Sequence, residues 1–412
     1  MKLADIDISD VAFAALWLLV FCIPWEEEFS VAQGIALSHV IGIAASVAGI
    51  MAALLTCRIR HPHHLHYLLL AFVVWMTASY AWSFAPDATA TKATSCIQLL
   101  VMVWLIWQFA PSRLRQMQLI TAYVLGSFVS EASVIYAFAT HTGNNLGLAD
   151  GRYTATGFDE NELGVTLALG LVMSCYLVAQ RAKPVSLWIV QIPLSMMCIC
   201  LTGSRGGVLA MSVAVVMIPM ALMKSKRRWL IVSSMIVLLA FAAAVVPATT
   251  WDRLATIQSE VSEGTLTNRT RIWTAGLDVF REHPLIGVGF GAFGESVYSR
   301  LDIVYVAHNS YLSILVELGI VGELIFLTVL GASFYLAATL PDTVRMAWLL
   351  LLTTWCVSVS SLTWEHRKPT WLLFGLLIAQ SSAYSDGLAT NFIRQSSSFV
   401  PLNSDGAFSS QT

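Results

Sequence analysis

The sequence predicts an all-α, polytopic membrane protein. Hydrophobic residues make up 57% of the 412 residues and charged residues 12%, which is about half the charged share of a soluble globular chain. The mean hydropathy is +0.71. Apolar runs of roughly 17 to 25 residues, long enough to cross a ~30 Å hydrocarbon layer, recur from one end to the other. No stretch of soluble composition remains for a water-soluble catalytic domain.

Charge and cysteine content exclude several classes of protein. The net charge of −2 and the pI near 6.5 provide no concentrated basic face for nucleic acid. The first ten residues carry one lysine and three aspartates, so they lack the basic start of a cleaved signal peptide. We therefore expect the first apolar run to remain as a helix. The seven cysteines lack CxxC spacing and read as small buried hydrophobes rather than metal ligands or disulfides: Cys22, Cys57, Cys96, Cys175, Cys198, Cys200 and Cys356.

The apolar runs predict twelve membrane-spanning helices, which divide the chain into four parts. The predicted spans are roughly residues 11–24, 31–55, 67–84, 95–110, 118–139, 163–179, 187–202, 207–223, 229–247, 310–338, 346–362 and 370–384. The four parts are nine spans over 1–247, a long outer loop over 248–309, three spans over 310–384 and a disordered tail over 385–412.

Basic residues in the short loops predict the orientation, because cytoplasmic loops are enriched in lysine and arginine. The basic residues fall in alternate loops: Arg58 and Arg60, Arg113 and Arg115, Arg181 and Lys183, and Lys224 to Arg228. Both termini are then cytoplasmic and the long loop faces outward. The RHPHHLH segment from Arg60 to His66 has no nearby carboxylate or cysteine, so we interpret it as a solvated interfacial turn rather than a metal site.

Two of the outer loops carry isolated cationic groups. The first includes Arg152, Asp159 and Asn161, and the second is the tight TGSRGG turn around Arg205. An arginine between two apolar spans is costly unless an anion meets it. The flanking glycines would let a ligand approach the backbone closely. The alternative is an arginine that extends to lipid phosphate at the interface.

The long loop contains a segment with helical spacing, from Asn268 to His283, which Pro284 ends. Its apolar stripe is predicted to consist of Trp273, Leu277 and Phe280. Arg269 and Arg271 fall in its first turn, where free N–H groups and the helix dipole already favour phosphate. Alternatively, the helix lies on the outer leaflet with its arginines on lipid headgroups.

A histidine stands where the tenth predicted span begins. Gly287, Gly289 and Gly291 follow no strand, so they predict a compact turn back to the membrane rather than a dinucleotide site. His308 comes next, and its ordinary pKa of about 6.5 suits proton abstraction near neutrality. Asn309 and Ser310 are the candidate N-caps of the span.

Three polar residues share one face of the tenth span: Ser310, Ser313 and Glu317. Glu317 would lie about 10 to 14 Å inside the span, so we expect one of the loop arginines to pair with it. Glu323 falls on a different face and is assigned to helix packing. The last outer loop brings Glu365 to Lys368 to the same surface, where it either completes an anion site or anchors the interface.

The segments RIWTAGLDVFREHPLIGVGFGAF and HNSYLSILVELGIVG resemble the signature region of the O-antigen ligase/polymerase superfamily. Ser204 to Gly206 and Arg152 to Asn161 match two weaker upstream motifs. The motifs together cover Arg152 to Gly322. One departure is Glu160, where relatives often have proline.

The resemblance implies a bacterial inner-membrane glycosyltransferase of the C type, which acts at the periplasmic face without a metal or other cofactor. The donor would be an undecaprenyl-diphosphate-linked oligosaccharide, and the acceptor a saccharide. Arg205 and Arg271 would hold the donor diphosphate, His308 would be the base, and Arg152 would be a supporting anion contact. The remaining substrate-binding candidates are Arg269, Asn161, Asn309 and Glu317.

The favoured function is en bloc transfer that polymerises exopolysaccharide or O-antigen repeat units. A sugar diphosphate carries its own leaving group, so the site needs cations for the departing phosphate and a base for the incoming hydroxyl. The alternatives are ligation to lipid A core or to protein, and transport of lipid-linked saccharides. Sparse charge within the spans argues against a transporter. Chain-length or export proteins are further expected partners, besides the bilayer itself.

Overall fold

A computed structural model describes residues 7–32, 35–142, 152–221 and 269–397, together with isolated positions between 229 and 240. These residues are almost entirely helical, as predicted. One short antiparallel pair, β1 (Ser30–Ala32) and β2 (Ile35–Ala36), joins the first two long helices. It forms because the connection is short enough to close as a hairpin, with the Leu37 N–H donating to the Phe29 carbonyl over 2.9 Å.

The helices follow one another through short turns. They are α1 (Ile8–Cys22), η2 (Ile23–Trp25), α2 (Leu37–Thr56), α3 (His64–Ala78), η3 (Ser79–Trp82), α4 (Pro86–Phe109), α5 (Arg113–Thr140), α6 (Glu160–Ala179), α7 (Val185–Leu201) and α8 (Arg205–Ala221). After these come α12 (Arg269–Glu282), α13 (Phe293–Leu301), α14 (Ser310–Ala338), α15 (Asp342–Val359) and α16 (Lys368–Ser397).

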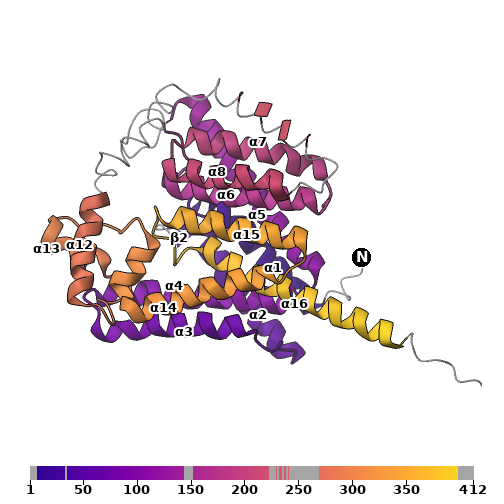
Figure 1. Ribbon diagram of the computed structural model, residues 1–412, viewed down its shortest axis with the longest axis horizontal. Helices are drawn as coiled ribbons and strands as arrows, with labels where there is room; N and C mark the ends of the chain where they lie inside the picture. The colour runs from indigo at the N-terminus through magenta and orange to yellow at the C-terminus, as the bar shows by residue number, and fades with distance from the viewer. Residues whose placement is uncertain are drawn as a thin grey trace, which may run out of the picture.

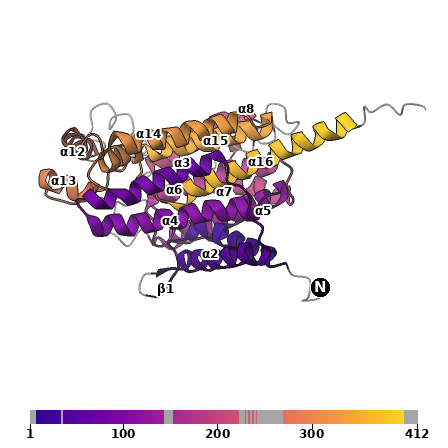
Figure 2. The same ribbon diagram turned by 90° about the horizontal axis from the view of Figure 1, so that it is seen from below.

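The long helices run alongside one another as a bundle, and α12 and α13 lie beyond one end of it (Figure 1). The start of α1 and the end of α16 lie at the opposite end (Figure 2). This is the arrangement that an even number of membrane crossings predicts for the two ends of the chain. The connections before α6, before α8 and before α16 lie at the α12–α13 end, which we call the loop end.

Seven of the described helices are long and apolar enough to cross a membrane: α1 with η2, α2, α3 with η3, α4, α5, α6 and α14. The chain is therefore a polytopic membrane protein. Eleven of the twelve predicted spans overlap helices of the structure. The start predicted for the second span, residue 31, was wrong, because β1 and β2 occupy the residues before Leu37. The ninth, 229–247, lies largely outside the described residues, so the total of twelve stays a prediction, as does the C-type fold.

The last helix runs further than the sequence indicates. Disorder was predicted from residue 385, but α16 continues to Ser397. Extending an existing helix needs far less free energy than starting one, and the next helix breaker is Pro401. The rest of the predicted tail lies outside the described residues.

Two glycines bring α6 and α8 together at the loop end. A Cβ on Gly164 would lie 3.1 Å from the Gly207 Cα, and a Cβ on Gly207 would lie 3.0 Å from the Gly164 Cα. Only backbones without side chains approach this closely. Asp159 caps α6, because its side chain accepts from the Asn161 N–H at 2.8 Å. The close packing therefore holds the start of α6 beside Arg205, the first residue of α8.

Helix α14 is interrupted at Gly319, which has φ 67° and ψ −170°. Backbone groups around the break pair with the glycine-rich turn instead of with the helix. The Gly289 N–H donates to the Glu317 carbonyl at 2.8 Å, and the Ile320 N–H donates to the Pro284 carbonyl at 2.9 Å. A break at this depth is tolerated because protein groups satisfy the open backbone.

Residues 269–307 form a small domain at the loop end, and its core is completed by Leu312 and Val316 of α14. Its buried side chains include Ile272 and Val279 of α12 and Phe293 of α13. The helix predicted from Asn268 to His283 is confirmed as α12, but its apolar stripe was wrong in part, since Leu277 is 40% exposed. The buried face is centred instead on Ile272, Gly276 and Val279, and the Phe293 ring packs on Gly276, where a Cβ would lie 3.0 Å from the ring.

Candidate functional site

The structure brings together four charged or titratable side chains at the loop end. Asp159 caps α6, Arg205 starts α8, Arg269 starts α12, and His308 precedes α14. Each lies at the end of a helix, on a connection that the bundle fixes in place. Three of the four were predicted site residues. Asp159 was noted in its loop but not assigned to the site, and its position before a helix with two carboxylates in the first turn was the available signal.

Backbone contacts on both sides hold His308. Its φ of 46° lies in the left-handed region, which is uncommon for a residue with a side chain and costs of order 1 to 3 kcal/mol. The Trp273 indole N–H donates to the Ala307 carbonyl at 2.9 Å. The Asn309 side chain caps α14 by accepting from the Leu312 N–H at 3.1 Å, so the predicted cap is confirmed. The histidine is thus fixed between α12 and α14.

Burial and neighbouring charges keep the His308 imidazole neutral. Burial lowers its pKa, the positive charge of Arg269 lowers it further, and the Asp159 carboxylate opposes both. A neutral imidazole near pH 7 has the lone pair that a general base needs.

Arg269 carries a positive charge that its surroundings only partly compensate. Burial lowers the pKa of its guanidinium, Asp159 raises it, and the charge of Arg205 lowers it again. The net direction is downward, which means that the protein disfavours the charge it holds there. Two partly buried like charges beside the Asp159 carboxylate form a suitable site for an anion.

Asn161 links the two upstream loops rather than standing alone. Its side-chain oxygen accepts from the Ser204 hydroxyl at 2.9 Å, and the Ser204 oxygen in turn accepts from the Gly207 N–H at 3.0 Å. The chain of bonds ties the start of α6 to the turn that presents Arg205. Asn161 thereby positions the arginine.

Arg152 is buried and already paired. It is 7% exposed, its Nη1 lies 3.3 Å from a carboxylate oxygen of Glu160, and its Nε donates to the Thr202 carbonyl at 3.1 Å. Glu160 is the residue at which the sequence departs from the pattern it resembles. Here it supplies the counter-charge for Arg152 at the start of α6.

Arg271 lies on the exposed face of α12, while Arg269 is partly buried beside His308. The sequence favoured Arg271 for the diphosphate over Arg269. Helical spacing cannot decide between them, because the faces of α12 are set by its contact with α13 and α14.

The expected arginine partner of Glu317 was wrong. Its carboxylate accepts from the Gly291 N–H at 2.7 Å and from the Phe293 N–H at 3.2 Å. The sequence could not show this because glycine-rich turns offer N–H groups only once their backbone is folded, and here Gly287, Gly289 and Gly291 all have positive φ. The predicted compact turn is confirmed, and the Glu317 carboxylate accepts hydrogen bonds from its backbone N–H groups.

The connection before α16, which was predicted to be the last outer loop, carries several ion pairs. Arg367 donates to Glu27 at 3.1 Å and to Glu162 at 2.6 Å, and Lys368 pairs with Glu26. Burial lowers the pKa of Arg367, but the carboxylates outweigh it, so that its pKa is raised. Carboxylates in direct contact compensate these two cations, whereas the charge of Arg269 is only partly compensated.

The segment that contains most of this site is similar in sequence to known proteins. Residues 191–327 match the family described as O-Antigen ligase. An 84-residue segment is 29% identical to the "Exopolysaccharide production protein ExoQ" of Rhizobium meliloti (strain 1021). Both matches support a relationship of this part of the chain to the O-antigen ligase/polymerase superfamily. The second alignment spans 18% of this chain and 19% of the relative's length.

The O-antigen ligase segment runs from α7 into α14 and therefore includes Arg205, Arg269 and His308. Asp159 and Asn161 lie outside it, on α6. The structure thus joins the matched segment to an upstream connection through the Gly164–Gly207 contact.

Proposed function

We propose that this chain is a glycosyltransferase that transfers an undecaprenyl-diphosphate-linked oligosaccharide en bloc to a sugar hydroxyl at the periplasmic face. Its product is a polymer of exopolysaccharide or O-antigen repeat units. The observation that carries the proposal is the meeting of Arg205, Arg269 and a neutral His308 at one end of the bundle. The exopolysaccharide relative favours polymerisation over ligation to lipid A core.

The residues suit a direct displacement. His308 accepts the proton of the acceptor hydroxyl as its oxygen attacks the anomeric carbon of the donor sugar. The bond from that carbon to the diphosphate oxygen breaks, and the electron pair leaves with the diphosphate. Arg205 and Arg269 stabilise the charge that develops there. One displacement inverts the anomeric carbon and needs no covalent enzyme intermediate or metal ion.

The first experiment is deletion of the gene followed by analysis of lipid-linked intermediates. A polymerase defect leaves single repeat units on the carrier lipid, and a ligase defect leaves long chains there. Accumulation of single units is the expected result. Long carrier-linked chains would reassign the protein to ligation, and unchanged polymer would remove the proposal.

The second experiment complements the deletion with single variants. His308→Ala and Arg269→Gln should each reduce product by at least about 100-fold, since each removes a group that acts in the transition state. Arg281→Gln is the matched control. Arg281 lies on the same helix, but its side chain is 71% exposed and pairs with Asp278. Comparable loss in the control would contradict the assignment.

A further inference from the structure

A cavity of about 580 Å³ lies between α2 and α4 and shares no lining residue with the site around His308. Its longer part is apolar. Ile43, Val47 and Ile50 line it from α2, and Leu99 and Met102 line it from α4. The α2 side chains are about half exposed, so the cavity is a groove that opens sideways toward the membrane. Such a groove suits a hydrocarbon chain.

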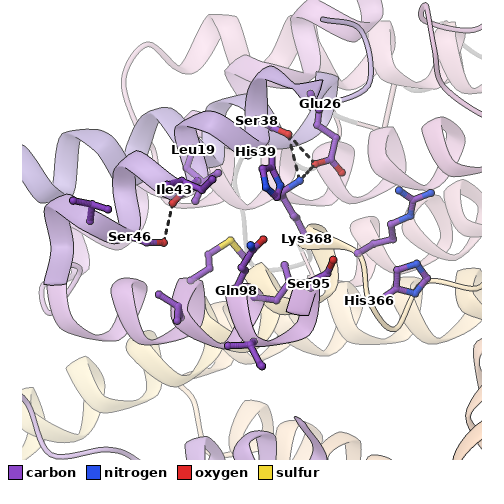
Figure 3. Close-up of a pocket in the computed structure, with 18 of the residues that line it drawn as sticks. Leu19, Glu26, Ser38, His39, Ile43, Ser46, Ser95, Gln98, His366 and Lys368 are labelled. Carbon is purple, nitrogen blue, oxygen red and sulfur yellow. Dashed lines mark hydrogen bonds and ion pairs between the residues drawn. The ribbon is translucent and has the colours of Figure 1, made fainter. Parts of the chain in front are cut away.

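Polar side chains close the groove at the loop end. Figure 3 shows Glu26, Ser38 and Lys368 hydrogen-bonded to one another, with His39 and His366 beside them. The polar surface continues into a shallower depression. That depression is lined by His39, Thr91, Thr94, Ser95 and Gln98. Hydroxyl, amide and imidazole groups at one end of an apolar groove match an amphiphile whose headgroup carries hydroxyls.

We propose that the α2–α4 groove binds a lipid-linked saccharide in the role of acceptor, with its polyprenyl chain along Ile43 to Ile50 and its sugars toward His39 and Gln98. This inference rests on the proposed function and names where the second substrate lies. Ordinary phospholipid is the competing occupant.

The charges at the polar end favour the acceptor over the donor. A departing diphosphate needs cations that are not already neutralised, as Arg269 supplies. At the groove, Lys368 is paired with Glu26 and Arg367 with Glu27. An acceptor keeps its diphosphate through the reaction. The protein must therefore bind this diphosphate but does not have to stabilise it as a leaving group.

One side chain joins the groove to the site. Arg367 lines the groove, and it contacts both Glu27 of the groove and Glu162 in the first turn of α6. Asp159, the neighbour of His308, caps that same helix. A saccharide that leaves the polar end of the groove therefore meets the start of α6, where the proposed base lies.

The test uses the full-length protein in lipid nanodiscs and an undecaprenyl-diphosphate-linked disaccharide with a diazirine in its lipid chain. We expect crosslinks to peptides of α2 and α4. An excess of the unlabelled disaccharide lipid should suppress them, and the same excess of phosphatidylglycerol should not. Equal suppression by both lipids, or crosslinks confined to other helices, would overturn the proposal.

A matched pair of variants gives a kinetic readout. Val47 and Met51 are on α2 and are 52% and 51% exposed, but only Val47 lines the groove. Val47→Trp should raise the acceptor KM by about ten-fold with the donor KM unchanged, and Met51→Trp should leave both unchanged. A Val47→Trp enzyme with an unchanged acceptor KM would overturn the groove assignment alone. Specific crosslinking by a protein with no transferase activity would overturn the proposed function alone.

Discussion

At the scale of single residues, the groups around His308 set the pH range in which it can act as a base. Burial and Arg269 both lower its pKa, and Asp159 raises it. The neutral form, which is the base, exists above the pKa. The lowered pKa therefore extends the base form to more acidic conditions than an ordinary histidine, with a pKa of about 6.5, would allow.

This environment predicts the pH dependence of transfer. The acidic limb of kcat/KM should lie below pH ~6.5. In the residual activity of Arg269→Gln, the limb should move to higher pH, because the positive charge that lowers the pKa of His308 is lost. Asp159→Asn should move it downward, because the opposing carboxylate is lost. The measurement is kcat/KM against pH for the three proteins, and shifts in the same direction for both variants would contradict the arrangement.

The Arg152–Glu160 pair makes a second prediction at this scale. Arg152→Met should lower the free energy of unfolding by about 3 kcal/mol, because it removes the ion pair that Arg152 makes with the buried Glu160 carboxylate. The double variant with Glu160→Gln should recover much of the loss, since no buried charge then remains. Thermal unfolding of the purified proteins in detergent measures both. A double variant that is less stable than the single one would exclude this account.

Some of the site could be predicted from single residues and some could not. The positions of Arg205 and His308 beside membrane helices were readable from the sequence, because costly cations near apolar runs are conspicuous. The choice between Arg269 and Arg271 was not, because it depends on how α12 turns against α13. Likewise, the partners of the Glu317 carboxylate are the backbone N–H groups of Gly291 and Phe293, which a pattern of side chains cannot predict.

At the scale of elements, the glycine-rich turn determines how the small domain over 269–307 attaches to the bundle. Gly289 has φ 103°, and a Cβ there would lie 2.4 Å from the Ser83 hydroxyl oxygen in the connection between α3 and α4. The Phe84 N–H donates to the Val288 carbonyl at 2.9 Å in the same contact. The turn thus fits between α14 and the α3–α4 connection with no room for a side chain.

A substitution pair tests this attachment. Gly289→Ala should loosen the 269–307 domain, increasing its cleavage by protease and lowering transfer activity by about ten-fold or more, since a left-handed position and a close contact are both violated. Gly331→Ala, in the middle of α14, meets nothing within 4 Å and should be neutral or slightly stabilising. Limited proteolysis and a transfer assay provide the comparison. A protected, fully active Gly289→Ala protein would show that the fit is looser than described.

Sequence patterns predicted the positions of the helices better than they predicted the contacts of single side chains. Apolar runs placed the bundle helices, and Pro284 correctly ended α12. The break at Gly319 was missed because a glycine in an apolar run is ordinary in membrane helices. The hairpin of β1 and β2 was missed because its strands are too short for alternation to show.

At the scale of the whole molecule, the loop end and the opposite end should face different compartments. Residues of the site gather at the loop end, while the α2–α3 turn, with Cys57, lies at the other. Basic residues in that turn predict that it is cytoplasmic. The described structure gives the arrangement of the helices, and the orientation follows from charge.

Thiol labelling tests the orientation. Cys57 is exposed, and Tyr298 on α13 is 51% exposed at the loop end. A reagent that cannot cross the inner membrane should label the Tyr298→Cys protein in cells with a permeable outer membrane and should leave Cys57 unlabelled until the inner membrane is opened. Labelling of Cys57 in unopened cells would reverse the predicted orientation and place the site in the cytoplasm.

The interruption of α14 also constrains the order in which the chain matures. The N–H groups of Ile320 and Val321 find their acceptors on Pro284 and Leu285, which leave the ribosome earlier. The second half of α14 cannot settle in hydrocarbon with those groups bare. The turn that contains Pro284 and Leu285 must therefore be folded before the second half of α14 takes its final position, and α15 and α16 pack against that half afterwards.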